Sequence, residues 1–122
     1  MPNQEIRRND WRDFFDEFSR SHESWLATVE VFGDLGAQTI AEELPLVGIV
    51  ADEPSHGGAV AIVLGRGNDT LTHTVARPAR VDVERTEEGA EAAVEIESTG
   101  GEKTLLRFRS SVPPDEVDGT LE

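Results

Sequence analysis

The spacing of hydrophobic residues changes once along the chain, near residue 24. Before that point, large apolar residues recur at intervals of three and four, which is typical of a helix buried on one side. These residues are Trp11, Phe14, Phe15 and Phe18. Asn9 or Asp10 can cap the start of this helix, and we expect it to end between residues 21 and 23.

From residue 24 onward, apolar and polar residues alternate, which is typical of β-strands. In the first such segment, Trp25, Ala27, Val29 and Val31 share one face. Residues 44–51 and 59–64 are nearly continuous apolar runs, a pattern typical of strands covered on both faces. We expect the aromatic residues of the helix to pack on these two runs. Further short strands are expected at 37–41 and 71–75.

The last three strands can be aligned from the sequence because one register matches both the apolar and the charged residues. It uses turns at 88–89 and 99–101. The predicted pairs are Val83 with Val94, Arg80 with Glu97, Val94 with Leu106, Ala92 with Phe108, Glu97 with Lys103, and Glu91 with Arg109.

These elements predict a mainly β fold, α+β by helix count. Its N-terminal amphipathic helix packs on a seven- to eight-stranded antiparallel meander. The need to hide strand edges favours a small closed or partly open barrel, and a two-layer β-sandwich is the alternative. We expect residues 1–8 to be a flexible lead-in and 9–109 to form a single domain. Residues 110–122, which contain Pro113, Pro114 and several acids, are expected to form a mobile tail.

The chain is strongly acidic, with 25 acidic residues against 11 basic ones and a formal net charge of -14. Such a charge disfavours binding to nucleic acid and to anionic membranes. The acids are spread along the whole chain, so we interpret them mainly as a solubility or salt adaptation. Steering toward a basic partner is the alternative. The absence of cysteine, of a signal peptide and of a membrane-spanning apolar stretch predicts a cytoplasmic protein.

No group of residues predicts a reaction. The three histidines, His22, His56 and His73, lack the spacing of a metal site, and the serines lack the sequence context of a nucleophile. We therefore predict no catalytic residue, no metal and no cofactor. His73 shares a strand face with Leu71 and Val75, so it is either a core histidine or a polar anchor in a ligand pocket near Trp25.

Four short segments occur in a recognisable order: Trp11-Arg12-x-Phe14-Phe15, Pro45-Leu46-Val47-Gly48-Ile49, Leu71-Thr72-His73 and Thr104-Leu105-Leu106-Arg107-Phe108. Through them the chain resembles, over residues 5–108, a family of small bacterial proteins catalogued only as a domain of unknown function. The resemblance implies a stand-alone bacterial cytosolic protein and brings no activity with it.

The leading functional hypothesis is a non-enzymatic binding or interaction protein of the cytoplasm. A second hypothesis is a small-ligand carrier with a pocket near Trp25 and His73, and a third is an enzyme. The protein is expected to be a monomer or a homodimer paired through an edge strand.

Overall fold

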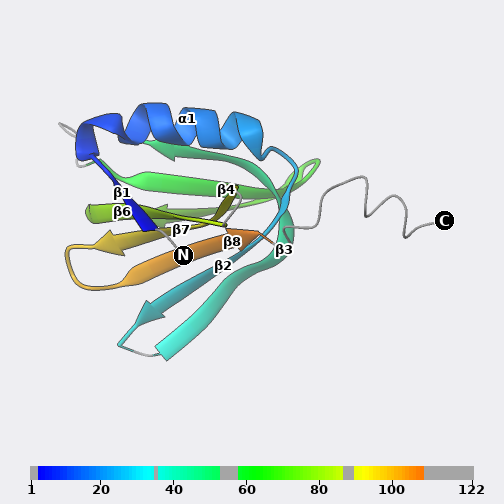
Figure 1. Cartoon of the computed structure of the whole chain (residues 1–122). Coiled ribbons are helices and arrows are strands. Elements are labelled where there is room, and N and C mark those ends of the chain that lie inside the picture. The colour runs from blue at the N-terminus through cyan, green and yellow to red at the C-terminus, as the bar shows by residue number, and fades with distance from the viewer. Residues whose placement is uncertain (1–2, 35, 53–57, 87–89, 109–122) are drawn as a thin grey trace.

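Figure 1 shows the computed structural model of the chain, which describes residues 3–34, 36–52, 58–86 and 90–108. In chain order the elements are β1 (Asn3–Ile6), the 3-10 helix η1 (Arg8–Asp10), α1 (Trp11–Ser21), β2 (Leu26–Gly33), β3 (Gly36–Ala51), β4 (Val60–Arg66), β5 (Asp69–Val75), β6 (Pro78–Arg85), β7 (Glu91–Ser98) and β8 (Lys103–Phe108). The strands form one antiparallel sheet in the order β1-β6-β7-β8-β2-β3-β4-β5.

Helix α1 is amphipathic as predicted and packs on the sheet next to β3 (Figure 1). The side chains of Trp11, Phe15 and Phe18 are buried, and Phe14 is partly buried against the same core. Asp10 occupies the N-cap position, but its side chain makes no capping hydrogen bond. The aromatic stripe therefore attaches the helix to the sheet by apolar burial, the dominant favourable term in folding.

Strand β3 is one long strand where the sequence pattern suggested two. Its first part, up to Pro45, pairs with β2, and its second part, from Leu46, pairs with β4. Near the end of the first part, Glu43 has a left-handed backbone (φ +50°). The Glu43 N–H donates to Thr28 Oγ1 at 3.2 Å. The hydroxyl of Thr28 therefore accepts the Glu43 N–H at the point where the register between β2 and β3 is irregular.

Strand β3 bends along its length (Figure 1), and its change of partner divides the sheet into two parts. The larger part runs from β1 to the first half of β3, and the smaller part consists of the second half of β3 with β4 and β5. We call the smaller part the β3–β4–β5 sheet. The mainly β fold with its helix packed on an antiparallel sheet is confirmed. Hydrogen bonds do not close the sheet, because β1 and β5 are its two edges in the described chain. The barrel closure favoured by the sequence argument is therefore not observed.

The predicted register of the last strands is confirmed at four of the predicted pairs. Strands β7 and β8 pair only from Ala93 onward, so the predicted pair of Ala92 with Phe108 is not observed. Val83 lies opposite Val94, and Val94 lies opposite Leu106. The charged pairs Arg80 with Glu97 and Glu97 with Lys103 are also present. The turn at 99–101 is closed by a bond from Ser98 N–H to Glu102 O at 2.8 Å. The turn at 88–89, the pair that uses Arg109 and the tail at 110–122 lie outside the described residues.

The expected flexible lead-in at 1–8 was wrong for residues 3–6, which form β1 and pair with Val81–Glu84 of β6. Ile6 is buried, and its carbonyl accepts a hydrogen bond from Trp11 Nε1 at 2.9 Å. A strand of four residues is too short to show a hydrophobic period. It is held by its partner strand and by the first residue of the helix stripe.

Helix α1 also covers one edge of β3. Ile49 lies opposite Ile62 of β4. On its other side, the Ile49 N–H donates to Ser19 Oγ at 2.8 Å, and Ser19 Oγ donates to the Ile49 carbonyl at 3.2 Å. The hydroxyl of Ser19 therefore forms hydrogen bonds with both the N–H and the carbonyl of Ile49. At this point β2 no longer pairs with β3.

We expect Ser19→Ala to lower the free energy of unfolding by about 1–3 kcal/mol, because it leaves both peptide groups of Ile49 without their partner. Urea unfolding followed by circular dichroism measures the change. The matched control is Ser21→Ala on the same helix, where the side chain is exposed and the expected change is within about 0.5 kcal/mol. Equal effects of the two substitutions would contradict this role for Ser19.

Candidate functional site

The outer side of the β3–β4–β5 sheet is formed by small uncharged side chains. In an antiparallel sheet, residues directly opposite one another point to the same side. One outer row joins Val50, Ala61 and Thr74, and the next joins Gly48, Val63 and Thr72. Together with the exposed bulge residue Val47, these side chains form what we call the uncharged face. Its members are Val47, Val50, Ala61, Val63, Thr72 and Thr74.

The uncharged face stands out because of the charge around it. Residues 44–51, 59–64 and 70–75 contain no Asp, Glu, Lys or Arg, although the chain has 25 Asp and Glu and 11 Lys and Arg. The outer side of the larger part of the sheet instead carries ion pairs. Arg80 Nε lies 2.8 Å from Asp82 Oδ2, and Arg107 Nη1 lies 2.7 Å from Glu30 Oε1. Charge is therefore segregated between the two parts of the sheet.

Two valines of this face are well exposed, Val47 at 48% and Val50 at 60%. The apolar runs predicted cover on both faces, and this is wrong for the described chain. Helix α1 covers the inner side, where Leu46, Ile49 and Ile62 are buried. These two β-branched residues lie three positions apart on β3 and form an exposed apolar area. Contact with another surface would bury this area favourably.

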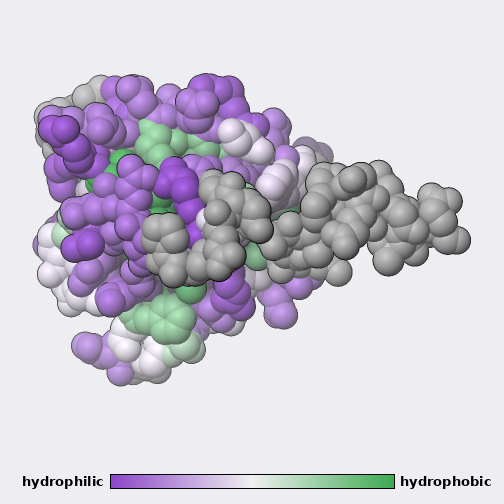
Figure 2. All heavy atoms as spheres, in the orientation of Figure 1, coloured by the Kyte–Doolittle hydropathy of each residue, from purple (hydrophilic) through white to green (hydrophobic). Residues whose placement is uncertain are grey.

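Hydrophilic residues predominate on the side of the molecule seen in Figure 2, and hydrophobic residues gather in smaller areas. One such area lies beneath α1. Phe14 of this helix is partly buried and packs against the core. This distribution is ordinary for an acidic protein, so charge alone does not single out an interaction site on that side.

The structure places Trp25 at the turn between α1 and β2, where it is 42% exposed. Its ring meets His22 edge to face at 4.6 Å and Phe108 at 5.2 Å between centroids. Its three strand partners in the predicted pattern, Ala27, Val29 and Val31, are buried. Trp25 itself precedes the strand and closes an aromatic cluster around the buried ring of His22.

His73 lies in the middle of β5, on the inner side with Leu71 and Val75, as its pattern predicted. It is half-buried and lies opposite Ile62. Burial lowers the pKa of His73 below its usual value of 6.5, and the charge of Glu102 partly opposes this shift. Strands β3 and β4 separate β5 from β2, and none of the described contacts brings His73 to Trp25.

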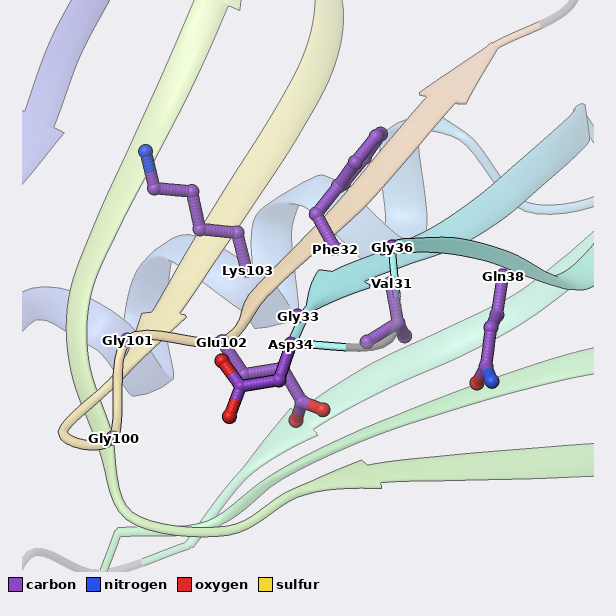
Figure 3. Close-up of a pocket in the computed structure, with 10 residues that line it drawn as sticks. All are labelled: Val31, Phe32, Gly33, Asp34, Gly36, Gln38, Gly100, Gly101, Glu102 and Lys103. Atoms are coloured by element: carbon purple, nitrogen blue, oxygen red, sulfur yellow. The ribbon is translucent and has the colours of Figure 1, made fainter.

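A hollow of about 600 Å³ lies between the tips of the β2–β3 and β7–β8 hairpins. Figure 3 shows the carboxylates of Asp34 and Glu102 on the same side of it as Gln38, while Phe32 and Lys103 point the other way. Neither Trp25 nor His73 lines this hollow. His73 is connected to it only through the electrostatic effect of Glu102.

Sequence reasoning missed both the uncharged face and the hollow. The two apolar runs indicated that both sides of these strands are apolar. They do not show which of the two sides is covered by other parts of the same chain. The hollow had no signal, because glycines, polar residues and two apolar residues from hairpins that are distant in the sequence line it together.

The fold defines a mainly β protein with an open antiparallel sheet and one covering helix. The chain belongs to the Family of unknown function (DUF5335), whose model matches residues 2–117. The predicted resemblance to a family of unknown function is therefore confirmed. Neither the curated proteins nor the solved structures contain a match to the chain. Within the described residues, no helix is both long and apolar enough to span a membrane.

The pKa of His73 predicts a pH-dependent stability. A histidine whose pKa is lower in the folded chain than in the unfolded chain contributes to stability. This contribution is fully present above the unfolded pKa of 6.5 and is lost as the pH falls through the lower pKa of the folded chain. We expect the wild type to lose more stability than His73→Gln between about pH 7.5 and 5.5. Unfolding in urea at several pH values measures the difference.

Glu102→Gln is the companion variant, because it removes the charge that opposes the shift. The pKa of His73 then falls further, and the loss of stability over the same pH window becomes larger. Parallel pH curves for all three proteins would show that His73 does not titrate differently in the folded chain.

Proposed function

We propose that this protein is a non-enzymatic interaction protein that docks a partner protein on the uncharged face. The observation that carries the proposal is the exposure of Val47 and Val50 on a face without charge, in a chain of net charge -14. In this proposal the curled sheet is a partly open barrel that holds the face rigid. Its proposed location is the bacterial cytoplasm, and a core without cysteine suits a reducing compartment.

The composition of the face favours a partner with a flat apolar surface. Valine, alanine and threonine are short and stiff, so they lose little side-chain entropy on binding and offer no deep pocket. A basic partner would be attracted first to the acidic surface elsewhere, and a nucleic acid would be repelled by it. The uncharged face is the region where desolvation is least costly, because no charge has to leave water there.

Site-specific photo-crosslinking in the native host tests this proposal. With a photoreactive amino acid at Val50, we expect a discrete adduct of higher mass. The matched control is Glu84, an exposed residue of β6 on the charged part of the sheet, where no such adduct is expected. The adduct at Val50 should disappear when Val63→Lys introduces a charge into the adjacent outer row.

The proposal fails if Val50 gives no adduct, or if Glu84 gives the same set of adducts. It also fails if Val63→Lys leaves the adduct at Val50 unchanged while circular dichroism shows that the variant is folded. The identity of the crosslinked protein then follows from mass spectrometry.

The hollow favours a second candidate function, the binding of a small ligand. Its volume of about 600 Å³ lies within the usual range of ligand sites, roughly 300–1,000 Å³. Asp34 and Glu102 present their carboxylates on one side of it, while the amine of Lys103 points away (Figure 3). This arrangement favours a small organic cation with an apolar body, which would replace the pocket near Trp25 and His73 suggested by the sequence.

Benzamidine and benzoate test this second candidate, because they have nearly the same shape and opposite charge. We expect benzamidine to shift the backbone NMR resonances of Val31, Gln38 and Gly101, and benzoate to leave them unchanged. Glu102→Gln should weaken the benzamidine shifts. Equal shifts with both compounds, or none with either, would eliminate a cation site in the hollow.

A further inference from the structure

Strand β5 is a long strand edge that no described element covers. All seven of its residues pair with β4 on one side, and the strand is last in the sheet order, so no described strand pairs with its other side. The opposite edge of this small sheet, along β3, is covered by Ser19 of α1. Strand edges in soluble proteins are usually protected by charges, prolines or bulges. Residues 70–75 contain no charge and no proline, and their register with β4 is regular.

The backbone groups that this edge presents can be assigned. A two-residue turn, Gly67 and Asn68, joins β4 to β5, so the flanking pair Arg66 with Asp69 exchanges hydrogen bonds and the bonding alternates from there. The peptide groups of Thr70, Thr72 and Thr74 therefore point to the free edge.

The bonds of Ser19 support this alternation independently. By the same count, Ile62 of β4 directs its peptide groups to His73 of β5. Ile49, opposite Ile62, must then direct its own groups away from β4. That is the side on which Ser19 binds both of them.

We propose that β5 pairs antiparallel with β5 of a second copy of this chain, with the two-fold axis at Thr72. In this register Thr72 faces Thr72 of the second copy, and Thr70 faces its Thr74. Each of these pairs brings together residues whose peptide groups point to the free edge, so each exchanges two hydrogen bonds. The proposal goes beyond the docking function, because it uses the edge of the sheet and leaves the uncharged face open.

The sequence of the strand favours a second copy as the occupant. Thr70-Leu71-Thr72-His73-Thr74 has threonine at both ends and in the centre, so the outer side of the junction becomes a ladder of threonine pairs. Cross-strand threonine pairs stabilise antiparallel sheets. On the inner side, Leu71 faces His73 of the second copy. An isologous interface needs this kind of self-complementarity, whereas a foreign strand does not.

The charge distribution favours the same edge. Two chains of net charge -14 repel each other, and β5 lets them meet where neither has a charge between residues 70 and 75. The remaining repulsion is long-range and is screened by salt, so added salt should tighten the dimer. The joined edges also place the two uncharged faces side by side on one continuous six-stranded surface.

Sedimentation equilibrium of the full chain, up to about 1 mM, measures the self-association. We expect a monomer–dimer equilibrium that Thr72→Pro weakens at least about tenfold. Proline removes the N–H at the centre of the junction but costs no bond to β4, because that N–H points to the free edge. Thr72→Val keeps the N–H and loses only the hydroxyl, so it should dimerise much more tightly than Thr72→Pro. A single-chain mass at every concentration, or an unchanged dimer in Thr72→Pro, overturns the proposal.

A cysteine variant tests the register and does not depend on proline being tolerated. The chain has no cysteine, so Thr72→Cys introduces a single thiol. At the two-fold axis the two Cα atoms would lie about 5.5 Å apart, within the range of a disulfide. Mild oxidation should yield a covalent dimer from Thr72→Cys and much less from Thr70→Cys, whose counterpart is Thr74. Equal yields would overturn this register.

These results are distinguishable from failure of the docking function. A monomer that still forms the Val50 adduct would exclude the β5 dimer and leave docking intact. A dimer without a heterologous Val50 adduct would do the reverse.

Discussion

The bend in β3 is the constraint on which the rest of this structure depends. One strand leaves β2 at Pro45 and joins β4 at Leu46, so the direction of the sheet changes within a few residues. Shortly before this point Glu43, which is not glycine, has a left-handed backbone, a conformation that costs of order 1–3 kcal/mol. Thr28 offsets part of this cost by accepting the Glu43 N–H. The second part of β3 carries Leu46 and Ile49, which are buried in the core that α1 contacts, so this core depends on the change of partner along β3.

The parts of the fold that the sequence predicted are those where two signals agree. The register of β6, β7 and β8 was predictable because two kinds of pair agree on it. A shift by one residue would break both the apolar pair formed by Val83 and the oppositely charged pair formed by Arg80. Helix α1 was predictable because four aromatic residues lie on one face. Strand β1 was not predictable, because it has one buried residue, Ile6, and depends on a partner strand far along the chain.

The candidate site was less predictable than the fold, for a physical reason. A run such as residues 44–51 indicates that both sides of a strand avoid water, but it cannot show whether the second cover is part of the same chain. The sequence correctly placed His73 on one strand face with Leu71 and Val75, and its half-burial explains the lowered pKa. The neighbourhood of Trp25 was not predicted correctly. The alternating pattern placed Trp25 in the strand, whereas it lies in the turn before β2, where the backbone is hydrogen-bonded to Leu46.

The pairing of β1 with β6 has a consequence for how the protein is made. Asn3 lies opposite Glu84, so β1 is synthesised long before the strand with which it pairs. The helix also emerges early, and its aromatic side chains have no sheet to cover them until β3 and β4 have followed. Order of synthesis and order of assembly are therefore opposed at the N-terminus. Until then these side chains are exposed apolar surface, which makes a partly folded chain prone to aggregation.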